Sequence, residues 1–122
     1  METQPKIGKI TIAPEVLETT ARLTALAVPG VVRLVSPPGM PRLLRHGEAK
    51  IEVIGNSVRV TLYVVTEPDV NMLSVGRQIQ AEVTRAIQDM IGMTVQSVDI
   101  YIEDIAPGSG PEKEAQAPRQ RR

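Results

Sequence analysis

Of the 14 acidic side chains in this 122-residue chain, Glu67 and Asp69 are the only close pair between the end of a predicted strand and the start of a predicted helix. The strongest group is Glu67-Pro68-Asp69, which lies where an apolar β-type stretch turns into a helical pattern. Ligands often bind at such strand-to-helix junctions, because backbone N–H groups of the first helical turn point toward them. Two carboxylates there favour either weak binding of a divalent cation or stabilisation of the helix dipole, worth about 0.3–1 kcal/mol. We expect the second role, and keep a small-ligand or divalent-metal site at residues 67–71 as the alternative.

The single histidine, His46, lies beside Arg45 and near Arg42 in a segment rich in proline and glycine. One histidine does not suffice for a His-based metal cage, and the chain has no cysteine to act as thiolate ligand, disulfide partner or nucleophile. Neither common glycine-rich phosphate-binding pattern occurs. We therefore expect His46 to be an exposed loop residue, and the protein to be a non-enzyme with no catalytic residue, no cofactor and no metal site.

The composition describes one small domain without a nucleic-acid-binding character. Hydrophobic residues make up 42% of the chain, which suits a single core. The 14 basic and 14 acidic residues balance, so the basic excess that attracts phosphate backbones is missing, and so is the GXXG loop of KH-type RNA-binding domains. No stretch has the length of a secretory or membrane-spanning segment. We expect a cytoplasmic protein with no direct transmembrane insertion and no nucleic-acid partner.

The first half of the chain shows two periodicities in succession. Ile10 and Ile12 alternate with polar residues, as in a strand, and Pro14 suits the first turn of a helix. Apolar residues then recur at helical spacing until a Pro-Gly pair ends the pattern. The predicted elements are a short strand around residues 10–12, a helix at 14–28, a strand at 31–35 and a loop at 36–47.

The second half has the pattern of a β-hairpin, a long helix and a final strand. Apolar residues alternate on both sides of a Gly55-Asn56-Ser57 turn. The helix begins after Asn71, a good N-cap, and ends before Gly92, which suits a left-handed backbone. We expect Gly76 to allow close packing of this helix on the sheet. The predicted core stripe contains Met72, Val75, Gly76, Ile79, Val83, Ala86, Ile87 and Met90.

The assembled order β-α-β-β-β-α-β predicts an α+β two-layer sandwich with two helices on one face of a small mixed sheet. The last crossover should be right-handed, which makes the strands at 58–66 and 94–105 parallel. We expect residues 1–106 to form a single domain. Residues 107–122 contain no apolar residue larger than Ala apart from prolines, so we expect a disordered C-terminal tail.

This order leaves the second face of the sheet uncovered. The only two aromatic residues, Tyr63 and Tyr101, fall on that face, near Arg59. One wet face is normal for a sheet with antiparallel strands, and a partner surface is the alternative. Arg33, Arg42, Arg45 and Arg59 can also gather near one end of the sheet and attract an anionic partner, although scattered arginines are usually ordinary surface charge. The candidate interaction surface comprises Arg59, Tyr63, Tyr101, Glu67, Asp69, Arg42, Arg45 and His46.

Five short patterns occur in an order and spacing that resemble a known family: a G-x-I-x-I start, a V-P-G-V helix end, an L-Y-V-V strand, an N-M-x-x-V helix start and a V-x-I-x-I final strand. They lie at residues 8–12, 28–31, 62–65, 71–80 and 98–105. The chain thereby resembles the alkaline shock protein / Gls-type family of bacterial envelope stress response proteins. Two features differ from many members: Glu67-Pro68-Asp69 replaces an aromatic-Gly pair, and the 36–47 loop is rich in proline.

The resemblance implies a non-enzymatic protein of envelope stress response or cell-envelope homeostasis. Some members of the family look like self-assembling proteins held at the membrane by a separate anchor. We therefore expect protein partners, namely the protein itself in a homo-oligomer and a small membrane anchor protein that places it at the inner face of the cell membrane. The competing hypothesis from another class is the accessory domain that binds a small ligand or divalent metal at residues 67–71.

Overall fold

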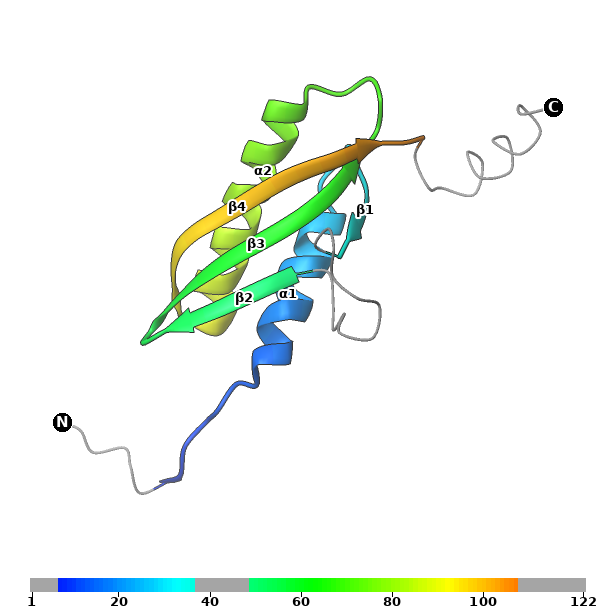
Figure 1. Ribbon diagram of the computed structural model, residues 1–122. Coiled ribbons are helices and arrows are strands. Elements are labelled where there is room, and N and C mark those ends of the chain that lie inside the picture. Colours follow the sequence, from blue (N-terminus) through cyan, green and yellow to red (C-terminus); the bar gives the residue numbers. More distant parts are fainter. Residues whose placement is uncertain (1–6, 37–48, 108–122) are drawn as a thin grey trace.

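Two helices cover one face of a four-stranded sheet in the computed structural model, which describes residues 7–36 and 49–107 (Figure 1). The sheet is mixed, because one of its pairings is parallel and the others are antiparallel. This confirms the α+β class and the placement of both helices on one face. The elements are α1 (Pro14–Leu26), β1 (Val31–Val35), β2 (Ala49–Ile54), β3 (Ser57–Thr66), α2 (Met72–Ala86), a π-helical turn η3 (Ile87–Ile91) and β4 (Thr94–Ile105).

Strand β3 is central, because each of the other described strands pairs with it. On one side it pairs with β4 in parallel along its whole length, as the crossover through α2 predicts. On the other side it pairs antiparallel with β2 over its first part and with β1 over its last part. Leu62 thus lies between Ala49 and Ile100, whereas Tyr63 lies between Val35 and Tyr101. β1 and β2 therefore follow one another along a single edge of β3.

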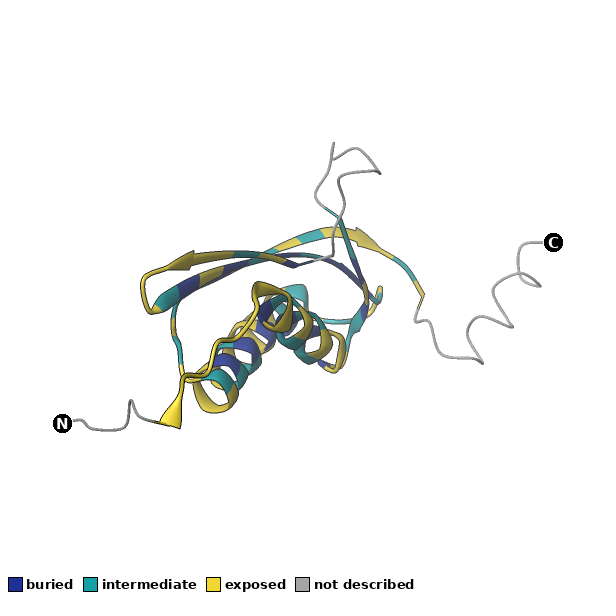
Figure 2. Cartoon of the chain, turned by 90° about the horizontal axis from the view of Figure 1, so that it is seen from below, coloured by how far each residue is buried: buried dark blue, intermediate teal, exposed yellow. Residues whose placement is uncertain are grey.

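The core lies between the sheet and the two helices (Figure 2). Alternate residues of β3 point inward and are fully buried, as the period-2 pattern predicts. They pack against the apolar stripes of α1 and α2. The inward residues of β3 are Val58, Val60, Leu62 and Val64, and their helical counterparts are Leu17, Ala21, Ala25, Val75, Ile79, Val83 and Ile87.

Both predicted ends of the second helix are confirmed. The side-chain oxygen of Asn71 accepts a hydrogen bond of 2.9 Å from the backbone N–H of Ser74, and Gly92 has a φ of 83°. The prediction that Met90 faces the core is wrong, because its side chain is 72% exposed. The last turn is π-helical, which changes the phase of the side chains, so that Ile91 packs against the core instead.

Nothing packs closely against Gly76, contrary to the expectation from the sequence. A Cβ atom at Gly76 would meet nothing within 4 Å. The tight position is Gly30, which has a φ of 99° and where an added Cβ would lie 2.9 Å from Cγ2 of Val75 and 3.3 Å from Cγ1 of Val70. Only glycine adopts this backbone conformation without strain. Gly30 thus sets how closely the end of α1 approaches the beginning of α2.

The predicted strand around residues 10–12 is absent. Residues 8–13 lead from the chain's described start into α1 without pairing to any described strand. In Figure 1 this segment runs away from the sheet beyond the N-terminal end of α1. The alternation of Ile10 and Ile12 is therefore real, but a strand also requires a partner edge to take its backbone hydrogen bonds. The predicted tail and the 36–47 loop fall almost entirely outside the described residues.

Substitution of the two glycines by alanine should change stability in opposite directions. We expect Gly30→Ala to lower the free energy of unfolding by about 1–3 kcal/mol, through backbone strain and the contact with Val75. Gly76→Ala should raise it by about 0.5–1 kcal/mol, because alanine favours the helix and has open space here. Urea unfolding followed by circular dichroism measures both. A loss of stability in Gly76→Ala would show that this glycine is a packing position after all.

Removal of the cap at the beginning of α2 should also be measurable. Asn71→Ala leaves the N–H of Ser74 without its side-chain acceptor, so we expect a loss of about 0.5–2 kcal/mol in the same unfolding assay. Asn71→Asp is the matched control, because its carboxylate accepts the same bond. Equal losses in the two variants would contradict the capping role.

Candidate functional site

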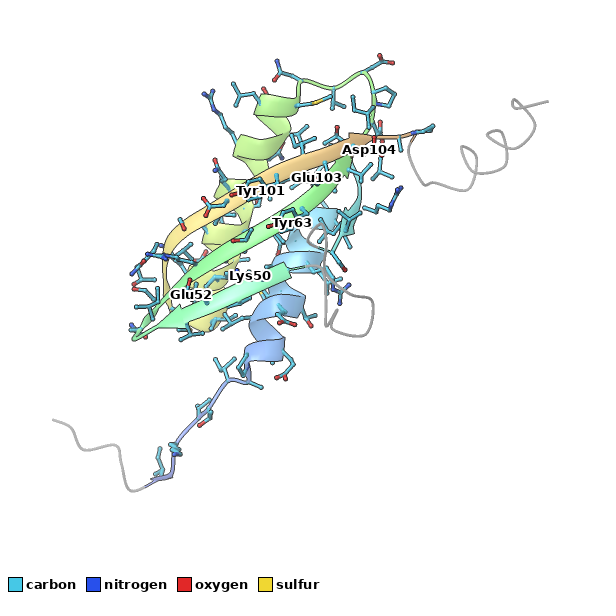
Figure 3. All side chains as sticks on the ribbon, in the orientation of Figure 1. Lys50, Glu52, Tyr63, Tyr101, Glu103 and Asp104 are labelled. Carbon is cyan, nitrogen blue, oxygen red and sulfur yellow. The ribbon has the colours of Figure 1, made fainter. Side chains whose placement is uncertain are left out.

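The two tyrosines stack on the uncovered face of the sheet. Tyr63 of β3 and Tyr101 of β4 are register partners, and their ring centroids lie 5.0 Å apart with an angle of 15° between the ring planes. Figure 3 shows both rings on the face of the sheet turned away from the helices. Tyr101 as a whole is 50% exposed. The face therefore presents a solvent-accessible aromatic pair.

Charged side chains surround this aromatic pair. The guanidinium of Arg59 on β3 lies 3.6 Å from the carboxylate of Glu52 on β2, and its Nε donates a hydrogen bond of 3.3 Å to Gln96 on β4. Such an exposed ion pair contributes little to stability, about 0–1 kcal/mol. We call the surface formed by these side chains the open face. Its members are Lys50, Glu52, Arg59, Thr61, Tyr63, Asp99, Tyr101 and Glu103.

A groove of about 380 Å³ lies beside the open face, between α2 and β4. Met72, Leu73 and Gly76 of α2 form one wall, and Ile100 and Ile102 of β4 form the other. Leu73 is 63% exposed, so an apolar side chain of this wall is accessible to a partner. We call this feature the β4 groove. Its polar boundary consists of Arg77 and Gln80.

The outer edge of β4 runs along this groove. Within residues 7–36 and 49–107, β4 pairs with β3 and with no other strand. The side chain of Gln80 donates a hydrogen bond of 2.9 Å to the carbonyl of Val98, and the carboxylate of Asp104 accepts one of 2.8 Å from the N–H of Ile105. Gln80 thus occupies the carbonyl of Val98, and Asp104 occupies the N–H of Ile105. Ile100 and Ile102 lie between them.

The strand-to-helix junction at residues 67–71 is built as a structural corner. The N–H of Glu67 donates to the carbonyl of Gly30 at 2.9 Å, which ties the corner to the end of α1. Asn71 supplies its side-chain oxygen to Ser74 and its carbonyl to the N–H of Val75. These N–H donors at the start of the helix are thereby used within the chain. Pro68 and Asp69 remain exposed at the outside of the corner.

The structure separates two of the four arginines that the sequence suggested as one cluster. Arg33 pairs in register with Val65, near the end of β3, whereas Arg59 lies near its beginning. At about 3.3 Å per residue, the two positions are about 20 Å apart. Arg42, Arg45 and His46 lie outside the described residues. Of the predicted interaction residues, Arg59, Tyr63 and Tyr101 share the open face, while Glu67 and Asp69 lie at the corner.

Among the described residues, no three histidine, cysteine, aspartate or glutamate side chains are grouped so as to hold a metal ion. None of the helices in those ranges is long and apolar enough to cross a bilayer. The β4 groove was not predicted from the sequence, which assigned Met72 and Gly76 to the core. The neighbouring apolar residue Leu73, which falls outside the core stripe, was the signal that a second apolar surface exists.

Solved structures of the MamM CTD share this fold. One variant matches over 77% of this chain and 100% of its own length, with 15% sequence identity and a TM-score of 0.52. A variant described as a copper form matches with the same coverage, identity and TM-score. At this level of identity, the similarity concerns the fold alone.

Two relatives occur in Bacillus subtilis (strain 168). YloU is 24% identical over 113 residues, which cover 86% of this chain and 94% of its own. YqhY is 24% identical over 105 residues, which cover 81% of this chain and 78% of its own. Both are described as uncharacterized proteins.

A family model matches residues 2–107, which confirms the resemblance noted in the sequence. The family is the alkaline shock protein family, and it is described by its cell envelope-related function. Because this match spans nearly the whole chain, the protein belongs to the alkaline shock protein / Gls-type family, whose function is related to the cell envelope.

Proposed function

We propose that this protein is a non-catalytic, self-associating scaffold of envelope stress response or cell-envelope homeostasis, and that a small membrane anchor protein recruits it through the open face. The family supplies the relation to the envelope. The observation that carries the proposal is the stacked pair of the half-buried Tyr63 and the exposed Tyr101, on a face that no described element covers.

The chemistry of the open face suits a protein partner. Tyrosine is enriched in the centres of protein interfaces, because its ring offers a large contact area and its hydroxyl offers a hydrogen bond. The charged residues around the two rings provide the polar rim that such interfaces usually have. Arg59, which is paired with Glu52 in the free protein, can exchange that weak partner for one on the bound protein. Aromatic and arginine residues are also the ones that dominate measured binding energies.

The rigidity of the open face supports the same role. Tyr63 and Tyr101 belong to adjacent strands in regular register, so the backbone fixes where both rings lie. Stacking restricts the rings further, which lowers the entropy that binding would otherwise cost. A sheet face with charged side chains around two rings differs from the concave, mostly apolar pockets that bind small molecules.

The metal-binding alternative is not carried forward. One of the similar MamM CTD structures is described as a copper form, but the likeness to this chain concerns the fold. The corner at residues 67–71 uses Asn71 as a helix cap, and the described residues contain no cluster of three metal-ligating side chains. No specific observation therefore favours metal binding at the corner.

A photo-crosslinking amino acid at the open face tests the proposal in living cells. With the crosslinker in place of Tyr101, we expect irradiation to join the protein to a specific envelope protein, because this side chain is exposed at the centre of the open face. The adduct is measured by immunoblotting and identified by mass spectrometry. Introducing Tyr63→Ala in the same chain should reduce the adduct several-fold, because the stacked partner ring is lost.

The matched control places the crosslinker at Gln88, which is exposed on the helical layer. This position should not give the same adduct. The proposal is wrong if positions 101 and 88 give the same adducts at equal yield, or if position 101 gives none in cells that produce the protein at its normal level.

A further inference from the structure

The segment before α1 has the pattern of a strand without having a partner in the described part of the chain. Ile10 and Ile12 alternate with Lys9 and Thr11, so an extended chain would place the two isoleucines on one side and the polar residues on the other. Ile10 is 93% exposed and Ile12 is 38% exposed. Large aliphatic side chains that are so exposed in a row favour an apolar contact elsewhere.

The outer edge of β4 is the complementary feature. The carbonyl of Val98 points to this edge, because it accepts from Gln80 on the outer side. Backbone groups of alternate residues point to the same side of a strand, so Ile100 and Ile102 direct theirs outward as well. Proteins normally protect such an edge with charges, prolines or a covering element. Here, the apolar residues Ile100 and Ile102 lie on the edge between the two backbone groups that accept or donate a side-chain hydrogen bond.

The surroundings of the edge match the N-terminal segment on both sides. A strand added to β4 would place one set of side chains over the β4 groove, whose walls are Met72, Leu73, Gly76, Ile100 and Ile102. The other set would lie next to the open face. If Ile10 and Ile12 enter the groove, Lys9 lies on the other side of the added strand, where β4 carries Asp99 and Glu103. Opposite charges on neighbouring strands attract each other. The alternation of the segment thus fits the two environments of the edge.

We propose that residues 7–13 of a second copy of this protein add as a strand to the outer edge of β4, with Ile10 in the β4 groove. The protein would then self-associate by donating its N-terminal strand. Reciprocal donation closes a dimer, and donation in one direction builds a chain of subunits.

The donor must be a second copy, because the segment of the same chain is too short. The beginning of α2 lies against Gly30, at the C-terminal end of α1. The N-terminal segment leaves from the opposite end of α1, which has 13 residues and is therefore about 20 Å long. Ile10 lies four residues before Pro14, which gives it a reach of about 14 Å. This reach is shorter than α1 itself, so Ile10 cannot get to Leu73 and Gly76 at the other end of α1, and the path around α2 would add to the distance.

This inference deepens the self-association proposed above and does not depend on the role of the tyrosines. The β4 groove and the open face lie on different sides of β4. Loss of strand donation would remove Lys9 from the neighbourhood of Asp99 and Glu103 but would leave Tyr63 and Tyr101 in place, so we still expect the crosslink from position 101 to an envelope protein. Failure of either proposal can therefore be recognised without the other.

Disulfide trapping tests the contact directly, because the natural chain contains no cysteine. Two full-length variants of different size, Ile10→Cys and Leu73→Cys, are mixed, reduced and then oxidised. We expect a mixed disulfide between the two chains, measured on a non-reducing gel. The matched control is Thr11→Cys mixed with Leu73→Cys, because residue 11 faces away from the groove in the added strand; its yield should be at least about five-fold lower. Both substituted positions of the test pair are exposed, so folding is not at risk.

Blocking the groove gives the second measurement. Gly76→Leu places a side chain into the open space of the β4 groove, at a helical position where the core is not touched. We expect sedimentation velocity to show self-association weakened at least about ten-fold, and circular dichroism to show an unchanged or higher melting temperature. Gly76→Ala should associate nearly as the natural protein does, because its methyl group leaves most of the groove open.

Four results would overturn the proposal. The first is equal crosslinking from positions 10 and 11, and the second is undiminished association of a folded Gly76→Leu variant. The third is a natural protein that stays monomeric at all concentrations tested. The fourth is a crosslink that forms only within one chain in the Ile10→Cys/Leu73→Cys double variant. The last result would place the chain's own segment on the edge.

Discussion

Strand β3 is the constraint on which the rest of the structure depends. Among the described strands it is the one with partners on both sides, and its inward residues are completely buried. A shift of its register by one residue would exchange the buried valines for Arg59, Thr61 and Tyr63. The pairing with β4 through the α2 crossover, the hairpin with β2 and the return of β1 therefore all follow from one apolar pattern. The same pattern places the tyrosines outside the core.

This arrangement produces one covered face, one open face and two outer edges. The helices α1 and α2 suffice to cover one side of a sheet that is three strands wide, and no described element remains for the other side. The lengths of the strands are also unequal, since β4 runs along the combined length of β2 and β1, which share the far side of β3. The longest of the described strands is therefore also an edge strand, which is unusual unless something covers it.

Most of the fold was predictable from local patterns, and the misses have identifiable causes. The sequence sufficed where the residue type alone determines the local structure, as it does for the cap Asn71, for Gly92 and for the Gly55-Asn56 turn. Gly76 and Met90 were misassigned, because helical periodicity gives the direction of a side chain and not whether a neighbour lies there. The stacking of Tyr63 on Tyr101 needed the register of two strands that are far apart in the sequence.

The missing first strand and the uncovered edge of β4 have the same physical origin. A period-2 pattern states that a segment can bury one side in a sheet, but it does not state which edge receives it. Residues 8–13 carry that pattern and pair with no described strand, while β4 offers an outer edge beside an apolar groove. An unpaired N-terminal segment exposes its isoleucines to water, which is unfavourable. An uncovered edge of β4 can pair with strands of other chains. Since one chain cannot bring them together, the proposed pairing between two chains would satisfy the sequence pattern.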